Sequence, residues 1–325
     1  MKIAMLAPVA WRTPPENYGP WELVTSLLTE ELIKLGHDVT LFASGNSLTK
    51  AKLKAACSRG YQEDSAQDAK VTEYLHISNC MEVADDFEIV HNQFDFMPLC
   101  YSKLIKTPMV TTIHGFSSEQ IIPIYKKYNK NTYYVSISYA NRHPSLGYTA
   151  NVYHGIDLSQ YQLKTKPAED YLLFIGRIHP DKGTHLAIQI TKKAGQKLII
   201  AGLVPYLNNN EIQFVGNIGG KLKTETIQNA AALLHPIDFE EPFGLSVVEA
   251  MACGTPVIAF KKGSINEIIE DKKTGFLVED LTSAVNAIQH LSSIDNAYCR
   301  NYVKENFSKE KMAENYLNVY KNILQ

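Results

Sequence analysis

The chain alternates short apolar runs with helical patterns, and this alternation limits the folds that it can adopt. The first run is KIAMLA (residues 2–7), and residues 22–35 follow it with leucines at helical spacing. Gly36 stands where the end of a helix is expected, before a second run, DVTLFA (residues 38–43). This order predicts a βαβ unit with parallel strands. Further strands are expected at EIVH, MVTTIH, YYVSIS and ANVYH.

The same alternation starts again in the second half of the chain. Residues 154–171, HGIDLSQYQLKTKPAEDY, are polar and aperiodic, as expected of a linker between domains. New strands are predicted at YLLFIG, KLIIAG, IQFVG, ALLHPI, PVIAF and GFLVE. The sequence therefore predicts an α/β protein with two Rossmann-like, doubly wound domains that face each other across a ligand-binding cleft.

Domain boundaries follow from these patterns. We expect an N-terminal domain over residues 1–158 and a C-terminal domain over residues 159–307. Residues 308–325 form an amphipathic pattern, which we expect to be a helix that packs back on the N-terminal domain.

Composition excludes several classes of protein. A net charge of −2 lacks the basic excess of a nucleic-acid-binding domain. Five cysteines without a CxxC pair argue against a disulfide framework and against a zinc site, and favour a cytoplasmic protein. Small basic clusters indicate solvated surface or a weak peripheral contact with an acidic membrane, and include Lys50, Lys52, Lys54, Arg59, Lys126, Lys127 and Lys130.

Several common catalytic motifs are absent from the sequence. No G-x-G-x-x-G follows a strand and no P-loop occurs, so a nicotinamide or flavin enzyme and a P-loop NTPase are disfavoured. HExxH and G-x-S-x-G are also missing, which argues against a metalloprotease and an α/β-hydrolase.

Two cations follow the predicted strand YLLFIG. Arg177 and Lys182 stand in GRIHPDKG, between that strand and a helix. A guanidinium and an ammonium group at this position suit a phosphate or a diphosphate. A surface salt bridge is the alternative, and spacing alone does not separate the two.

A second anion site is predicted in HPIDFEEPFGLSVVEAMACGTPVIAF (residues 235–260). A helix is expected from about Leu245 to Cys253, with the free N–H groups of Leu245 and Ser246 at its positive end. Two carboxylates in this stretch, Glu241 and Glu249, are either an acid/base pair or two groups that hold a ligand.

The environment of Glu249 favours the second alternative. Its neighbours Val247, Val248, Ala250, Met251 and Ala252 are apolar, so a buried carboxylate there needs a polar partner. A ligand hydroxyl is a candidate for that partner.

Together these motifs resemble the retaining glycosyltransferases of family 4 (glycosyl transferases group 1), which have the GT-B fold. The resemblance is carried by Glu241-x7-Glu249 with AMACGTPVIAF, by GRIHPDKG upstream and by GSINEIIEDKKTGFLV downstream. It extends to MKIAMLAPVA, ELVTSLLTEELIKLGHDVTLFASG, VTTIHG, VSIS and VYHGIDLSQY.

The resemblance implies a hexosyltransferase-like enzyme that takes a nucleotide sugar as donor and retains the anomeric configuration. UDP-sugar is the favoured donor and a GDP- or ADP-sugar the alternative, with no cofactor and no metal. The acceptor, a saccharide, a lipid-linked sugar or a small molecule, is expected on the N-terminal domain, including the HNQFDF segment (residues 91–96).

The resemblance also implies roles for single residues. Arg177 and Lys182 would hold the departing diphosphate with backbone N–H groups of Gly244, Leu245 and Ser246. Glu241 would bind hydroxyls of the donor sugar and Glu249 those of the ribose, whereas Glu240 is expected to face solvent. His114 would lie beside the donor sugar, although alone it would be interpreted as a core histidine. The remaining donor-binding assignments are Gly19, Ile218, through its backbone to the base, and Phe243.

Two departures from the family pattern weaken individual assignments. The family commonly has a glycine pair where this chain has Gly19 and Pro20, and proline removes one backbone donor. The connection VPYLNNN (residues 204–210) is shorter than expected, which affects recognition of the base.

Two alternative functions stay open at this stage. A GT-B relative could use the same cleft for another reaction, such as epimerisation or phosphorolysis of a sugar. A non-catalytic, two-lobed sugar-binding protein would share the architecture, but it has no need of Arg177 with Lys182.

Overall fold

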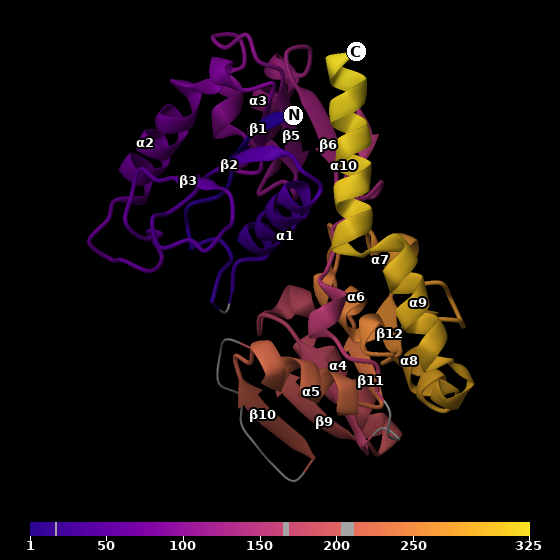
Figure 1. Cartoon of the computed structure of the whole chain (residues 1–325). Coiled ribbons are helices and arrows are strands. Elements are labelled where there is room, and N and C mark those ends of the chain that lie inside the picture. Colours follow the sequence, from indigo (N-terminus) through magenta and orange to yellow (C-terminus); the bar gives the residue numbers. More distant parts are fainter. Residues whose placement is uncertain (17, 165–168, 203–210) are drawn as a thin grey trace. The chain divides into compact units, whose positions relative to one another are not determined.

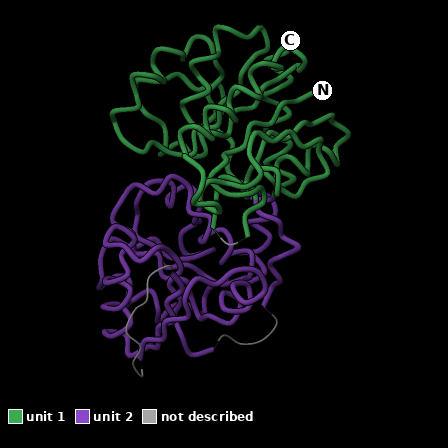
Figure 2. Tube along the Cα trace, turned by 90° about the vertical axis from the view of Figure 1, so that its left-hand side faces the viewer, with its two compact units in different colours: residues 1–155, 309–325 green, residues 156–308 purple. Residues whose placement is uncertain are grey.

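A computed structural model describes residues 1–16, 18–164, 169–202 and 211–325. The chain forms two compact units (Figure 2): unit 1 comprises Met1–Gly155 and Lys309–Gln325, and unit 2 comprises Ile156–Ser308. The sequence placed the boundaries after residues 158 and 307, whereas the chain passes between the units after Gly155 and after Ser308. The short connection at residues 204–210 lies outside the described residues.

Unit 1 contains a parallel sheet, several of whose strands are labelled in Figure 1. Its described strands have the order β3-β2-β1-β4-β5-β6-β7. The order reverses between β1 and β4, as in doubly wound folds. Most residues of the central strands are buried on both faces, which explains their continuous apolar sequences. The bounds are β1 Lys2–Leu6, β2 Asp38–Phe42, β3 Lys52–Lys54, β4 Ile89–Asn92, β5 Met109–Ile113, β6 Tyr133–Ser136 and β7 Ala150–Asn151.

The two helices predicted for unit 1 are present, and α2 and α3 are additions to the predicted pattern. Helix α1 begins at Pro20 rather than at residue 22, because Gly19 serves as its N-cap and proline suits the first helical position. Gly36 follows the end of α1 with φ 86°. Helix α2, N-capped by Asp68, was not predicted. The bounds are α1 Pro20–Lys34, α2 Ala69–Met81, η1 Ala84–Asp86, η2 Met97–Tyr101, η3 Glu119–Ile121, α3 Ile122–Tyr128 and α10 Lys309–Leu324.

Helix α10 belongs to unit 1, so the prediction that it packs back on the N-terminal domain is confirmed. It contacts α1 and buries Tyr316 and Tyr320 almost completely. The hydroxyl of Tyr316 lies 2.7 Å from that of Thr112, and the hydroxyl of Tyr320 lies 2.6 Å from His91 Nδ1. Polar as well as apolar contacts therefore hold this helix to the sheet.

Unit 2 contains a second parallel sheet, with the strand order β10-β9-β8-β11-β12-β13 in the described residues. The strand order reverses between β8 and β11, and ligands of such folds bind beyond the carboxyl ends of the strands at this point. The strands are β8 Tyr171–Ile175, β9 Lys197–Ala201, β10 Ile212–Gly216, β11 Ala232–His235, β12 Val257–Phe260 and β13 Gly275–Val278. The helices are η4 Leu158–Gln160, η5 Pro180–Lys182, α4 Thr184–Ala194, α5 Gly220–Asn229, α6 Leu245–Ala252, α7 Ile265–Ile268, α8 Leu281–Ile288, η6 Leu291–Ser293 and α9 Asn296–Asn306.

Strand β3 gives part of the predicted basic cluster a structural role. Lys52 and Lys54 are exposed at the edge of the sheet, where charged side chains prevent pairing with another chain. Lys52 Nζ also lies 3.0 Å from Asp38 Oδ1 on the neighbouring strand. Of the helices within the described ranges, none has both the length and the apolar character needed to span a bilayer.

The packing of α10 yields a first prediction. Tyr320→Phe should lower the free energy of unfolding of unit 1 by about 1–3 kcal/mol, because it leaves a buried nitrogen of His91 without its partner. The measurement is urea unfolding followed by a probe within unit 1. Tyr133→Phe, at a half-exposed position on β6, is the matched control and should change stability by less than about 0.5 kcal/mol. Equal effects of the two variants would contradict the assignment.

Candidate functional site

The turn between β8 and α4 carries Lys182 and packs closely against the end of β11. Gly183 connects η5 to α4 in the left-handed region, with φ 72°. A Cβ atom at this position would lie only 1.8 Å from the backbone oxygen of Pro236, so glycine is required. The N–H of Asp238 donates to the Asp181 carbonyl at 2.7 Å and ties the same two turns together.

Lys182 and Glu241 form a half-buried ion pair across these turns. Lys182 Nζ lies 3.0 Å from Glu241 Oε2, and the side chains are 23% and 11% exposed. The ammonium group also lies 4.3 Å from the centre of the Phe239 ring. Burial acts to raise the pKa of Glu241, but His235 and Lys182 together outweigh it and lower that pKa to about 2. Glu241 is therefore an anion rather than a proton donor near neutral pH.

A third turn, after β12, supports the loop that carries Glu240 and Glu241. A Cβ atom at Gly263 would lie 2.4 Å from the backbone nitrogen and oxygen of Glu241. The N–H of Ser264 donates to the Glu241 carbonyl at 2.9 Å, and the N–H of Gly263 donates to Glu240 Oε2 at 2.5 Å. Glu240 is exposed, as expected, but its carboxylate also helps to fix this turn.

Helix α6 begins directly after this loop and has no side-chain cap. Its N-cap is Gly244, in the left-handed region with φ 89°. The N–H groups of Gly244, Leu245 and Ser246 have no acceptor in the part of the chain that the structure describes. Free N–H groups and the positive end of the helix dipole make this helix start suitable for an anion. The helix ends at Ala252, one residue before the predicted end.

Phe243 is buried, unlike Leu245 and Ser246, which were also predicted to bind the donor. Its side chain is 3% exposed and its ring centre lies 6.0 Å from that of Phe307. The carbonyl of Phe243 accepts a hydrogen bond from Ser264 Oγ at 2.8 Å. Phe243 therefore supports the turn from within the core of unit 2.

Arg177 occupies an exposed position on the turn after β8. Its Nη2 atom lies 3.2 Å from Asp181 Oδ2, and its side chain is 55% exposed. The structure therefore pairs Arg177 with Asp181 and Lys182 with Glu241. An exposed ion pair contributes little free energy, so Arg177 can exchange its partner for a ligand at low cost.

Glu249 has protein partners that the sequence did not reveal. This buried carboxylate accepts a hydrogen bond from the Tyr161 hydroxyl at 2.7 Å. Lys223 Nζ, from the first turn of α5, lies 2.7 Å from Oε1 and 2.5 Å from Oε2. The apolar neighbours of Glu249 correctly indicated a polar partner, but that partner includes a lysine and a tyrosine distant in sequence. Ile218 lies half-buried in the preceding loop, between β10 and α5.

In unit 1, His114 follows β5 and is 5% exposed. Its Nε2 atom lies 2.7 Å from Gln93 Oε1 and its Nδ1 atom 3.2 Å from His154 Nε2. The ring stacks on that of Trp21 with centres 5.0 Å apart. Burial, with smaller contributions from His154 and His91, lowers the pKa of His114 well below its usual value. His114 is thus a neutral ring whose two nitrogens both have protein partners in this state.

The start of α1 holds a carboxylic acid that the sequence did not single out. Gly19 is buried with φ 150°, and a Cβ atom there would lie 2.9 Å from Glu22 Oε2. Burial raises the pKa of Glu22 to about 7, against hydrogen bonds from its own N–H and from the N–H of Trp11. Gly19 is therefore confined beside a buried carboxylic acid.

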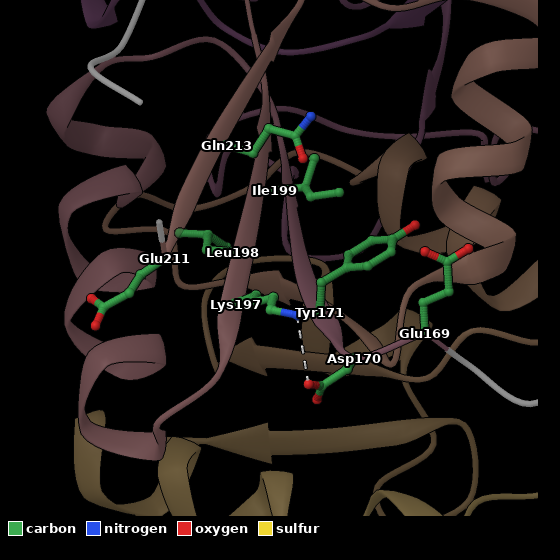
Figure 3. A pocket seen from close by; sticks show the side chains of 8 residues that line it. All are labelled: Glu169, Asp170, Tyr171, Lys197, Leu198, Ile199, Glu211 and Gln213. Atoms are coloured by element: carbon green, nitrogen blue, oxygen red, sulfur yellow. Dashed lines mark ion pairs between the residues drawn. The ribbon is translucent and has the colours of Figure 1, made fainter. Parts of the chain in front are cut away.

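A separate pocket lies at the amino ends of β8, β9 and β10 (Figure 3). Lys197 and Asp170 form an ion pair of 4.0 Å there. This is the edge of the sheet opposite to Lys182 and α6, and none of the predicted site residues lines the pocket. The lining residues are Glu169, Asp170, Tyr171, Lys197, Leu198, Ile199, Glu211 and Gln213.

Comparison with known proteins agrees with this geometry. Residues 157–309 match the family model of Glycosyl transferases group 1. An uncharacterized glycosyltransferase of Methanocaldococcus jannaschii is 24% identical, over 99% of this chain and 98% of that protein. Sucrose-phosphate synthase from Thermosynechococcus elongatus superposes with a TM-score of 0.77 and 18% identity, over 99% of both chains. Anabaena HepE in complex with UDP-glucose gives a TM-score of 0.72 and 17% identity, over 99% of this chain and 100% of that one.

The sequence matches and the structural matches support different conclusions. Residues 157–309, which are almost the whole of unit 2, form a Glycosyl transferases group 1 domain, and the chain is an enzyme of the glycosyltransferase class. The solved structures establish the GT-B type of fold, so the predicted pair of Rossmann-like units is confirmed. The cleft between the units stays a prediction.

The ionised carboxylate of Glu241, stabilised by His235 and Lys182, predicts a pH-dependent contribution to stability. Because the pKa of Glu241 is about 2 in the folded protein and 4.5 ordinarily, the contribution is present above about pH 4.5 and is lost as the pH falls toward 2. Glu241→Gln should therefore cost roughly 3 kcal/mol near pH 7, and the difference from the native protein should shrink below pH 4.5.

Urea unfolding of unit 2 at several pH values measures this effect. Glu240→Gln, at the adjacent exposed carboxylate, serves as the control and should show a much smaller and less pH-dependent difference. A difference for Glu241→Gln that stays constant from neutral pH to about pH 3 would contradict the assignment.

Proposed function

We propose that the chain is a retaining glycosyltransferase of family 4, which transfers a sugar from a nucleoside-diphosphate sugar to a hydroxyl group of its acceptor. The observation that carries the proposal is the convergence of Lys182, Glu241 and the uncapped start of α6 where the strand order of unit 2 reverses. This position is where doubly wound folds bind nucleotides.

The chemistry of the leaving group explains the arrangement. When the bond between the anomeric carbon and the diphosphate breaks, negative charge develops on the diphosphate. Fixed cations and aligned N–H dipoles stabilise this charge as it forms, and they need no reorganisation. In the proposal, Lys182, Arg177 and the N–H groups of Gly244, Leu245 and Ser246 supply this stabilisation, without a metal ion.

The two carboxylates then have separate tasks along the donor. We assign Glu241, ionised and held beside Lys182, to the hydroxyls of the donor sugar. Glu249 is assigned to the ribose hydroxyls, and the backbone at Ile218 to the base. Phe243 would contribute only by supporting the turn before α6, since its ring packs within unit 2.

We assign binding of the acceptor to unit 1, together with contacts to the donor sugar. His114 and Gly19 stand at the carboxyl edge of its sheet, together with residues 91–96. Because both ring nitrogens of His114 have protein partners, any contact with the donor sugar would use a ring edge or follow a change of partner. We propose UDP-sugar as the first donor to test, with GDP- and ADP-sugars next, and a cytoplasmic location, peripheral to the membrane at most.

Loss of either cation is the direct test of the leaving-group assignment. Lys182→Ala and Arg177→Ala should each lower turnover about 10²-fold or more, as loss of one charge-stabilising group does in other enzymes. The measurement is release of UDP from UDP-glucose, with or without acceptor, in a coupled assay. Lys197→Ala, at the opposite edge of the sheet, should leave turnover unchanged. Native turnover in both cation variants would refute the assignment.

The role of Glu249 predicts a selective loss of affinity. Glu249→Gln should weaken binding of UDP about tenfold, because a charged hydrogen-bond partner of the ribose is removed. Binding of inorganic pyrophosphate, which has no ribose, should change much less. Calorimetry with both ligands measures the difference, and equal losses would indicate that Glu249 only supports Lys223 and Tyr161.

A further inference from the structure

His235 has a buried nitrogen whose position requires an explanation. It is the last residue of β11 and is 4% exposed. Its Nε2 atom has no hydrogen-bond partner in the described part of the chain, and the nearest carboxylate atom, Glu241 Oε2, is 3.6 Å away. At this separation the imidazole stabilises the Glu241 anion through space but does not form a well-aligned hydrogen bond. A buried polar nitrogen without such a bond costs free energy. Buried polar atoms without a hydrogen-bond partner are rare in folded proteins.

The same carboxylate oxygen of Glu241 is already occupied. Lys182 Nζ lies 3.0 Å from Oε2, so this atom has one close cation and one more distant imidazole nitrogen. The backbone around the three residues is fixed by the approach of Gly183 to Pro236 and by the hydrogen bond from Asp238 to Asp181. The His235 separation of 3.6 Å exceeds the Lys182 separation of 3.0 Å by only 0.6 Å, so a small side-chain motion is enough to change which partner is closer.

Binding of a diphosphate would change this balance. In the function proposed above, Lys182 turns toward the diphosphate of the donor, and Glu241 loses its cation. A carboxylate that is 11% exposed is costly to leave unpaired. His235 Nε2 stands close enough to replace Lys182 by shortening its distance to about 2.8–3.0 Å.

We propose that His235 is a positioning residue, which takes over the Glu241 carboxylate when Lys182 engages the diphosphate of the donor. Glu241 then keeps a fixed orientation toward the donor sugar throughout the exchange. The inference rests on the proposed function for its ligand, but the exchange between Lys182 and His235 is a property of the chain itself. Other charged groups on these turns include Asp181, which pairs with Arg177, Glu240, which accepts from the Gly263 N–H, and Asp238, which lies 3.5 Å from Lys262 Nζ.

The exchange can be tested without any ligand. Lys182→Met removes the ammonium group, so His235 Nε2 should form a hydrogen bond to Glu241. The imidazole ¹⁵N resonances of His235 should shift relative to the native protein, and the shift should vanish in the double variant Lys182→Met/Glu241→Ala. Resonances that stay the same in Lys182→Met would overturn the proposal, whether or not the protein binds a nucleotide.

A double-mutant cycle with UDP tests the consequence for binding. His235→Phe, which fills the space without a hydrogen-bonding nitrogen, should weaken UDP binding about tenfold, and His235→Asn should restore part of it. In a Glu241→Ala background, His235→Phe should change the affinity for UDP less than about twofold, because His235 no longer has a carboxylate to bind. Equal losses in both backgrounds would show a purely structural role and overturn the proposal. If the native protein binds none of UDP, GDP and ADP, the proposed function fails, and the ligand-free experiment still decides the exchange.

Discussion

Close backbone contact among three turns determines the candidate site of unit 2. Gly183 and Gly263 each stand where a side chain would collide with the loop after β11, so the absence of Cβ atoms lets the three turns meet. Lys182, Glu241 and the start of α6 depend on that contact for their positions. The close-packed, hydrogen-bonded backbone fixes these groups before any ligand arrives, and this is the kind of preorganisation on which electrostatic catalysis relies.

The ionised groups of the site pair with and neutralise one another. Glu241 and Glu249 each have a lysine partner, and Arg177 has an aspartate. Burial of the two glutamates is tolerated only because each is paired. A diphosphate entering this site would therefore have to exchange partners rather than bind to free cations. The affinity of the site for a diphosphate would then depend on the difference in free energy between two sets of ion pairs. The number of charged residues in the sequence does not determine this difference.

Local patterns predicted most of the fold, because alternating strand and helix signals, glycine positions and the apolar strands are all encoded over a few residues. The boundaries of α6 and α10 were found for the same reason. What the sequence did not reveal depends on contacts between distant residues: Lys223 and Tyr161 reach Glu249 from other elements. The short strand β3 was not predicted, because its sequence, Lys-Leu-Lys, contains a single apolar residue and therefore gives no strand pattern.

Unit 1 is built from two segments that are separated by the whole of unit 2 in the sequence. His91 and Thr112, inside its sheet, have hydroxyl partners on α10, which follows unit 2 in the sequence. During synthesis, these buried groups can meet their partners only after the whole of unit 2 has been translated. The N-terminal sheet is therefore expected to finish folding last, after the unit that is translated later, so that the order of maturation reverses the order of synthesis.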